Sequence, residues 1–254
     1  MPDISSINLS DLLPFIAVGF VAQAVDGALG MAFGVISTTL LLSIAVPPAA
    51  ASAGVHTVEC FTTGVSGASH VLHRNVDWRL FTRLVIPGVI GGIVGAYVLV
   101  QIDASVARPA VLAYLTVIGL YLVWRGYHYP PQAKDPRIVA PLGLAGGFLD
   151  AAGGGGWGPV VTSNLLLQGA DPRKVIGTVN SAEFFLTLTI SATFIAALGL
   201  ETFTTATVGL LIGGVVAAPL GAYAAKRVSA KLLLIMVGIV LTITSLYGIY
   251  RALA

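Results

Sequence analysis

The sequence predicts an all-α, polytopic helical membrane protein, and three observations support this prediction. Hydrophobic residues make up 56% of the 254 residues, only 9% are charged, and the mean hydropathy is +0.92. Soluble domains carry about 25% charged residues, so this composition excludes a soluble globule. The apolar stretches are also long enough to cross a bilayer, which takes about 20 helical residues. The third observation is an internal repeat in the order of these stretches.

The repeat appears when the sequence is shifted by 124 residues, because 19–63 then aligns with 143–187 without a gap. His56 aligns with Asn180, and Phe33 aligns with Trp157. The identical pairs include acids, glycines and threonines; they are Asp26 with Asp150, Gly30 with Gly154, Gly34 with Gly158, Thr38 with Thr162, Pro48 with Pro172, Glu59 with Glu183 and Thr63 with Thr187. Duplication of one helical unit explains this pattern.

We therefore expect two repeats, 12–125 and 138–252, joined by a polar linker at 126–137. Each repeat should contain a broken or re-entrant helical hairpin followed by three transmembrane helices, which gives about 8–10 helical segments in all. The first repeat is expected to consist of hairpin 12–46 and helices 49–72, 80–100 and 106–125. The second is expected to consist of hairpin 138–168 and helices 173–198, 203–224 and 229–252.

The positions of the basic residues predict how the repeats lie in the membrane, because Lys and Arg favour the cytoplasmic side. If 12–46 crosses once, the 13 Lys and Arg divide almost evenly between the two sides. If it enters and returns, only Arg108 and Arg251 lie outside. The second arrangement predicts inverted repeats with both termini outside. It places the linker and the loops 73–83, 168–174 and 225–231 in the cytoplasm.

The stretch "DAAGGGGWGP" at 150–159 is unusual for a membrane helix, and it predicts the place where the second hairpin breaks. The first hairpin should break at 26–34, so the two breaks are expected to meet near the midplane. Broken backbone is tolerated at that depth only inside protein or beside a water-filled cavity. Unpaired N–H groups at a helix start attract anions. Two plainer interpretations stay open: the glycines could serve close helix packing, and Asp26 and Asp150 could be helix caps.

Four of the 11 acidic residues fall inside apolar stretches, where a charge costs roughly 2.5–3.5 kcal/mol. His56, Glu59 and Thr63 share one helical face, and Asn180, Glu183 and Thr187 repeat that face. We expect Glu59 and Glu183 to carry protons along a transport pathway. The alternative is a structural network in which the glutamates bond backbone donors across the bundle.

These segments also resemble a known family. The stretches "VDGALGMAFGVIST", "LDAAGGGGWGPVVTSNLL" and "GADPRKVIGTVNSAEF", together with the duplicated layout, are similar to the TauE/SafE sulfite exporters, also called toluene-sulfonate uptake permeases. The resemblance covers nearly the whole chain. It implies a multi-pass carrier in a bacterial or archaeal plasma membrane that moves sulfite, sulfonates or related organosulfur anions by alternating access. A small sulfur-containing anion, the lipid bilayer and protons are then the expected partners.

The candidate substrate-binding residues are those at the two breaks and on the shared helical faces. They are Asp26, Gly30, Phe33, Gly34, Thr38, His56, Glu59, Asp150, Gly153, Gly154, Gly155, Gly156, Trp157, Thr162, Asn180, Ser181 and Glu183. Few basic side chains lie at this depth, so we expect main-chain N–H groups to contribute most of the anion binding, with Trp157 and Phe33 closing the cavity. No cofactor, metal ion or nucleic acid is expected.

Two other classes of function were weighed. The stretch "GVSG" at 64–67 is similar to the nucleophile motif of intramembrane serine proteases, whose serine needs a histidine base within reach. His70 and His73 lie at the end of the same helix and His128 lies in the linker, so no later span offers a base. The sequence therefore favours a protein that is not an enzyme. An anion channel built from the same halves stays open as an alternative.

Overall fold

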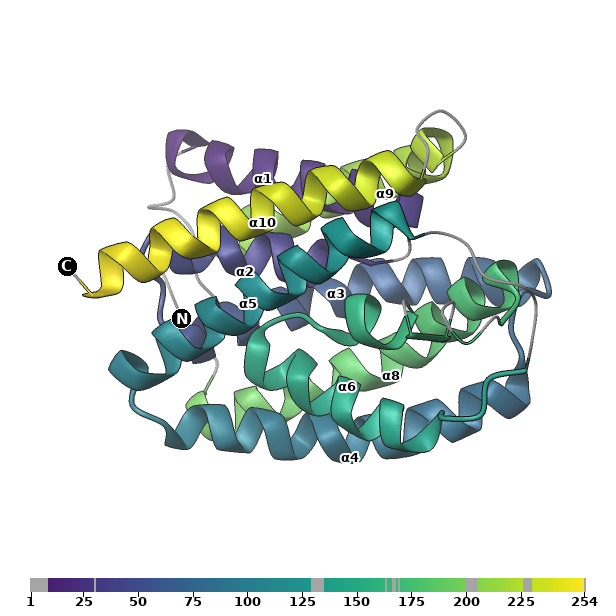
Figure 1. Cartoon of the computed structure of the whole chain (residues 1–254). Coiled ribbons are helices and arrows are strands. Elements are labelled where there is room, and N and C mark those ends of the chain that lie inside the picture. The colour runs from purple at the N-terminus through teal and green to yellow at the C-terminus, as the bar shows by residue number, and fades with distance from the viewer. Residues whose placement is uncertain are drawn as a thin grey trace.

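The computed structural model describes residues 9–29, 31–128, 135–162, 164–165, 168, 170–199, 205–225 and 230–253. Every regular element within these residues is a helix, which confirms the all-α prediction (Figure 1). In chain order the helices are α1 (Leu9–Leu29), α2 (Phe33–Ser43), α3 (Pro48–Leu72), α4 (Trp78–Gln101), α5 (Ala104–Tyr127), α6 (Ala140–Gly153), the π-helical turn η2 (Trp157–Thr162), α8 (Pro172–Leu198), α9 (Thr205–Ala225) and α10 (Ala230–Leu253).

The six long helices that follow the hairpins begin and end close to the residues predicted from hydrophobicity. The main difference concerns the linker expected at 126–137. Its first two residues belong to α5, which continues to Tyr127. The reason is packing: Gly126 lies against α10, where a Cβ on it would approach Ile235 Cγ1 to 2.6 Å. Residues 129–134 of the linker lie outside the described residues.

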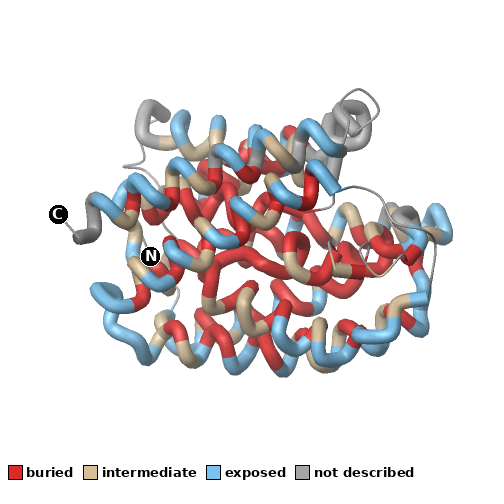
Figure 2. Tube along the Cα trace, viewed as in Figure 1, coloured by how far each residue is buried: buried red, intermediate tan, exposed pale blue. Residues whose placement is uncertain are grey.

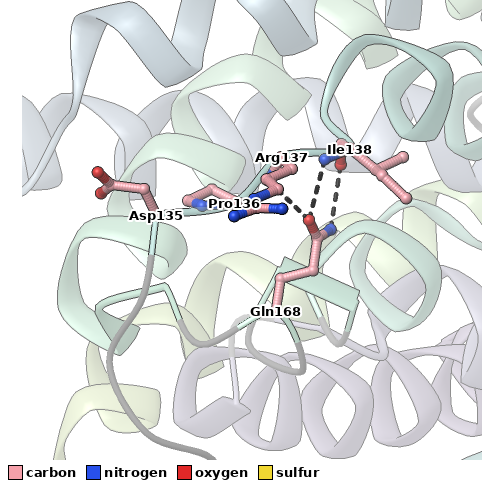
Figure 3. Close-up of a pocket in the computed structure, with 5 residues that line it drawn as sticks. All are labelled: Asp135, Pro136, Arg137, Ile138 and Gln168. Carbon is pink, nitrogen blue, oxygen red and sulfur yellow. Dashed lines mark hydrogen bonds between the residues drawn. The ribbon is translucent and has the colours of Figure 1, made fainter.

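Both expected hairpins contain a break. Helix α1 ends at Leu29 and α2 begins at Phe33, while α6 ends at Gly153 and η2 begins at Trp157. The end of the second hairpin, at Gln168, is also bonded to its beginning, at Arg137 and Ile138, as Figure 3 shows. The Gln168 Oε1 atom accepts bonds from the backbone N–H groups of Arg137 (2.9 Å) and Ile138 (3.0 Å), and Gln168 Nε2 donates to the Ile138 carbonyl at 3.1 Å. The chain thus enters and leaves this hairpin at the same end of the bundle.

Each hairpin's first helix packs along a helix of the other repeat. Helix α1 lies on α9, and α6 lies on α4. Glycines make both contacts close, since a Cβ on Gly213 would lie 2.0 Å from the Ile16 carbonyl and one on Gly147 would lie 2.1 Å from the Gly88 carbonyl. Such small-residue contacts let membrane helices approach backbone to backbone. The first helix of each repeat therefore packs mainly against the other repeat rather than against its own.

Equivalent helices of the two repeats run antiparallel. In the pair α3 and α8, Gly64 lies against Phe184, whereas Gly67, further along α3, lies against the earlier residue Ser181. In the pair α5 and α10, Gly119 approaches Gly238, whereas Leu112 approaches Gly248. An inverted duplication requires this orientation. Which end of the bundle faces the cytoplasm stays a prediction.

Buried residues gather at the centre of the bundle, and the outer helix faces are exposed and apolar (Figure 2). Ile86 on α4, Val117 on α5 and Ile243 on α10 are each more than 60% exposed. Among the described residues, three helices are long and apolar enough to cross a membrane by themselves: Trp78–Gln101, Ala104–Tyr127 and Lys174–Leu198. An apolar outer surface around a core with buried acids suits a protein whose solvent is lipid.

Candidate functional site

The two helix breaks meet in the centre of the bundle. A Cβ on Gly34, at the start of α2, would lie 2.9 Å from Gly155 Cα. The Thr38 hydroxyl, one turn further along α2, donates to the Gly154 carbonyl of the other break. Gly154 and Gly155 have φ values of 67° and 138°, which favour glycine, so the chain turns there without strain. Of the other break's candidates, Gly30 lies outside the described residues.

The aspartates beside the breaks bond the backbone amides that follow. Asp150 Oδ1 accepts from the N–H groups of Gly156 at 2.7 Å and Trp157 at 2.9 Å. In the first repeat, Asp26 Oδ1 accepts from the Phe33 N–H at 3.2 Å. The sequence predicted free amides here, and that prediction is wrong for these three donors. The physical reason is that a buried N–H without a partner costs about 1–3 kcal/mol, which the nearby carboxylates avoid.

A polar network joins α3 to the second break. His56 Nε2 lies 3.1 Å from Asp150 Oδ2, and both side chains are almost fully buried. His56 Nδ1 lies 2.7 Å from the Ser52 carbonyl oxygen, and the Ser52 hydroxyl donates to the Ala151 carbonyl at 2.7 Å. The second hairpin is therefore bonded to α3 at two adjacent residues, 150 and 151.

Two glutamates complete a cluster of four carboxyl groups. Glu59 is 4% exposed and its carboxyl group accepts from the Gly34 N–H, while its Oε2 atom has no hydrogen-bond partner among the described residues. The carboxyl group of Glu183, on α8, lies close enough to those of Glu59, Asp26 and Asp150 for their charges to interact. These four acids come from four different helices. The fold thus brings together all the acids that the sequence placed inside apolar stretches.

The aromatic candidates are packed rather than placed at an opening. Trp157 is fully buried, and its Nε1–H donates to the Val179 carbonyl at 3.2 Å. Its ring lies on α4, where a Cβ on Gly88 would approach it to 2.8 Å. Phe33 is 2% exposed. Both rings hold their hairpins in the bundle in this conformation.

The remaining candidates are buried on α8 and η2. Asn180 and Ser181 are buried on α8, and the Ser181 hydroxyl donates to the Gly177 carbonyl of its own helix at 2.8 Å. The Thr162 hydroxyl on η2 is buried and has no hydrogen-bond partner in the part of the chain that the structure describes. Thr38 and Thr162 are equivalent in the repeat, yet only Thr38 bonds the opposite break.

Sequence reasoning missed Tyr114 and Ser52. The Tyr114 hydroxyl, on α5, donates to the Gly155 carbonyl at 3.3 Å. Its ring covers the second break, because a Cβ on Gly153 would lie 2.4 Å from Tyr114 Cε1 and one on Gly156 would lie 2.3 Å from the hydroxyl oxygen. Contact with Tyr114 thus explains why Gly153 and Gly156 are glycines, whereas the first repeat has other residues at the equivalent positions. Ser52 could have been found as the residue one turn before His56 on the same helix.

Two cavities lie away from this centre, at the end of the bundle where α4 and α8 begin. One of about 700 Å³ is lined by Asp135, Pro136, Arg137, Ile138 and Gln168 (Figure 3). The other, of about 420 Å³, includes the basic residues Arg79, Arg83 and Lys174. No candidate site residue lines either cavity. Within the described residues, no group of three or more His, Cys, Asp or Glu side chains could hold a metal ion.

Comparison with known proteins identifies the family of the chain. The sequence model of the family described as "Sulfite exporter TauE/SafE" matches residues 15–248. The chain belongs to the TauE/SafE family. It is also 41% identical over 239 residues to the "Probable membrane transporter protein YtnM" of Bacillus subtilis (strain 168), a match that covers 91% of this chain and 80% of the relative. No solved structure matches significantly. This TauE/SafE protein is thus a multi-pass membrane transporter and not an enzyme.

Proposed function

We propose that this TauE/SafE protein is a secondary transporter of sulfur-containing anions that works by alternating access around the crossing of the two breaks. The observation that carries the proposal is the buried centre where Gly34 and Gly155 meet and where Glu59 keeps an unpartnered carboxyl oxygen. Sulfite, sulfonates and related organosulfur anions are the proposed substrates, because the family description names sulfite export. The proposed location is the plasma membrane, with both termini outside and two inverted repeats.

Coupling to protons follows from the charges at the centre. Four carboxyl groups at the centre lie near enough to one another for their charges to interact, and the His56 side chain is bonded to one of them, that of Asp150. At this depth, an anion beside several ionised carboxylates would be strongly repelled. Protonated carboxyl groups remove that repulsion and can donate hydrogen bonds to the oxygens of the substrate. We therefore assign Glu59 and Glu183 as the groups that take up protons when the anion binds.

Counterflow in proteoliposomes tests the proposal. Vesicles containing the protein are loaded with sulfite, thiosulfate or an organic sulfonate, and uptake of the labelled anion is measured with and without an imposed pH difference. We expect saturable exchange of at least one sulfur oxyanion, accelerated by the pH difference. If no member of the panel exchanges, the proposed substrate class is wrong. A large conductance that ignores the pH difference would instead identify an anion channel.

Glutamine variants test the role of the acids. Glu59→Gln keeps an acceptor for the Gly34 N–H but removes the titratable group, and Glu183→Gln makes the equivalent change on α8. We expect each to reduce or abolish the stimulation by the pH difference while counterflow continues. Asp103→Asn is the matched control, because Asp103 is exposed and caps α5 far from the crossing. Unchanged pH stimulation in both glutamine variants would remove the proton-carrying role.

A further inference from the structure

The hydrogen bonds of His56 fix where its protons lie. The Ser52 carbonyl oxygen, 2.7 Å from His56 Nδ1, can only accept a hydrogen bond. The Ser52 hydroxyl is 3.2 Å from the same nitrogen, but it already donates its proton to the Ala151 carbonyl at 2.7 Å. Among the described residues, no donor therefore faces Nδ1, and this nitrogen carries a proton itself.

The opposite ring nitrogen faces a carboxyl oxygen. His56 Nε2 and Asp150 Oδ2 are 3.1 Å apart. A hydrogen bond at this distance needs one more proton, either on Nε2, which gives imidazolium and carboxylate, or on Oδ2, which gives neutral imidazole and carboxylic acid. Both forms contain the same number of protons and are together uncharged. Loss of that proton would leave a lone pair on Nε2 facing a carboxylate, and the bond would be lost.

This arrangement exists in one half of the protein only. The repeat aligns His56 with Asn180 and Ser52 with Ile176, so the second copy has neither a titratable side chain nor a hydroxyl at these places. The His56–Asp150 bond therefore breaks the symmetry of the two halves. It acts on the second hairpin, because Asp150 Oδ1 at the same time holds the N–H groups of Gly156 and Trp157.

We propose that His56 and Asp150 form a proton-dependent latch that fastens the second hairpin to α3 in the transporter proposed above. With the shared proton present, the hairpin is held as the structure shows it. When that proton leaves to water, the two side chains separate, and the hairpin becomes free to move relative to α3. The movement of one hairpin is thereby tied to the binding and release of one proton.

Several other groups around the latch influence its proton. Asp26 on α1, Glu59 on α3 and Glu183 on α8 carry carboxyl groups in the same cluster, and Tyr114 on α5 lies near enough to Asp150 for their charges to interact. The Phe194 ring of α8 lies 6.5 Å from the His56 ring and adds no charge. Glu59, Glu183 and Tyr114 therefore interact with the Asp150 side of the latch through charge.

Nitrogen NMR tests the latch without any transport. The chain contains four histidines, so replacing His70, His73 and His128 by Gln leaves His56 as the only one. The ¹⁵N-histidine-labelled full chain, purified through a tag without histidine, is studied in lipid. We expect a protonated Nδ1, with Nε2 either protonated or accepting a hydrogen bond from Asp150 Oδ2. A neutral ring with a bare Nδ1 and a protonated Nε2 would overturn the proposal.

Transport measurements on the His56→Gln variant test whether the latch affects transport. Glutamine can place an N–H donor near Asp150 Oδ2 but cannot release a proton at accessible pH. We expect the change of transport rate with pH, measured relative to the variant's own maximum rate, to be smaller in His56→Gln than in the wild type, whereas His128→Gln, in an exposed position after α5, should match the wild type. A His56→Gln pH profile identical to that of the wild type would overturn the latch. If the wild type exchanges no sulfur anion, the proposed function fails, and the NMR result still decides the latch.

Discussion

Gly34 and Gly155 touch backbone to backbone at the point where the two broken hairpins cross. A Cβ on Gly155 would lie 2.5 Å from the Gly34 carbonyl carbon and 2.4 Å from the Val35 nitrogen. Side-chain rotation cannot relieve these contacts, since both partners are main-chain atoms. The crossing therefore depends on glycine at position 155.

Gly155→Ala should disrupt the crossing more than any other single-methyl change at the breaks. It combines a backbone clash with a φ of 138°, and a side chain at such a φ alone costs about 1–3 kcal/mol. We expect a large fall in the thermal unfolding midpoint in detergent and little folded protein. Gly199→Ala is the control, because Gly199 has a φ of 79° and no atom of the described residues lies within 4 Å of its Cβ position. If the unfolding midpoint of Gly155→Ala fell no further than that of Gly199→Ala, the close contact between Gly155 and Gly34 would be disproved.

Gly156→Ala should interfere mainly with one hydroxyl group. Its Cβ would lie 2.3 Å from the Tyr114 hydroxyl oxygen but 3.3 Å from the nearest main-chain atoms. We expect reduced counterflow in Gly156→Ala and substantial recovery in the double variant Gly156→Ala/Tyr114→Phe, which removes the clashing atom. Tyr114→Phe alone should lose about 1 kcal/mol of stability, as the bond to the Gly155 carbonyl is lost. Additive defects in the double variant would contradict this geometry.

Thr38 and Thr162 are equivalent in the repeat, and the structure predicts opposite outcomes for them. Thr38→Val should destabilise the protein by about 1–3 kcal/mol, because the Gly154 carbonyl loses its hydroxyl donor. Thr162→Val should leave stability nearly unchanged, because its buried hydroxyl has no partner to lose. Its effect should instead appear as a raised KM if that hydroxyl meets the substrate. Unfolding curves and transport kinetics of the two variants check this difference, and equal destabilisation would refute it.

Cysteine labelling can decide which end of the bundle faces the cytoplasm. Cys60 is the only cysteine, so Cys60→Ser gives a background to which single cysteines can be added at Asp103 or Asp135. Helix α4 separates the two positions by 24 residues, or about 36 Å. We expect an impermeant maleimide to label the Asp103→Cys variant in intact cells and the Asp135→Cys variant only after lysis. The reverse result would invert the predicted topology.

Much of the architecture could be predicted because its signals are local in the sequence. Hydrophobic length gave the long helices, such as α4 and α8, and the glycines marked both breaks. The repeat indicated which residues are equivalent. The predicted free amides were wrong because Asp26 and Asp150, six or seven residues from their partners, fold back over the breaks. Helix capping by these aspartates, which the sequence left open as an alternative, accounts for the bonds.

The sequence by itself determined that four acids lie within apolar helices beside two broken hairpins, because composition and spacing act along the chain. Only the tertiary structure decided that His56 meets Asp150 across 94 positions and that Tyr114 covers the second break. Such contacts depend on how helices cross, and the close glycine contacts between α1 and α9 and between α6 and α4 set that geometry. A hydrogen bond forms only within about 3 Å, so helix packing selects the partner of each buried polar group.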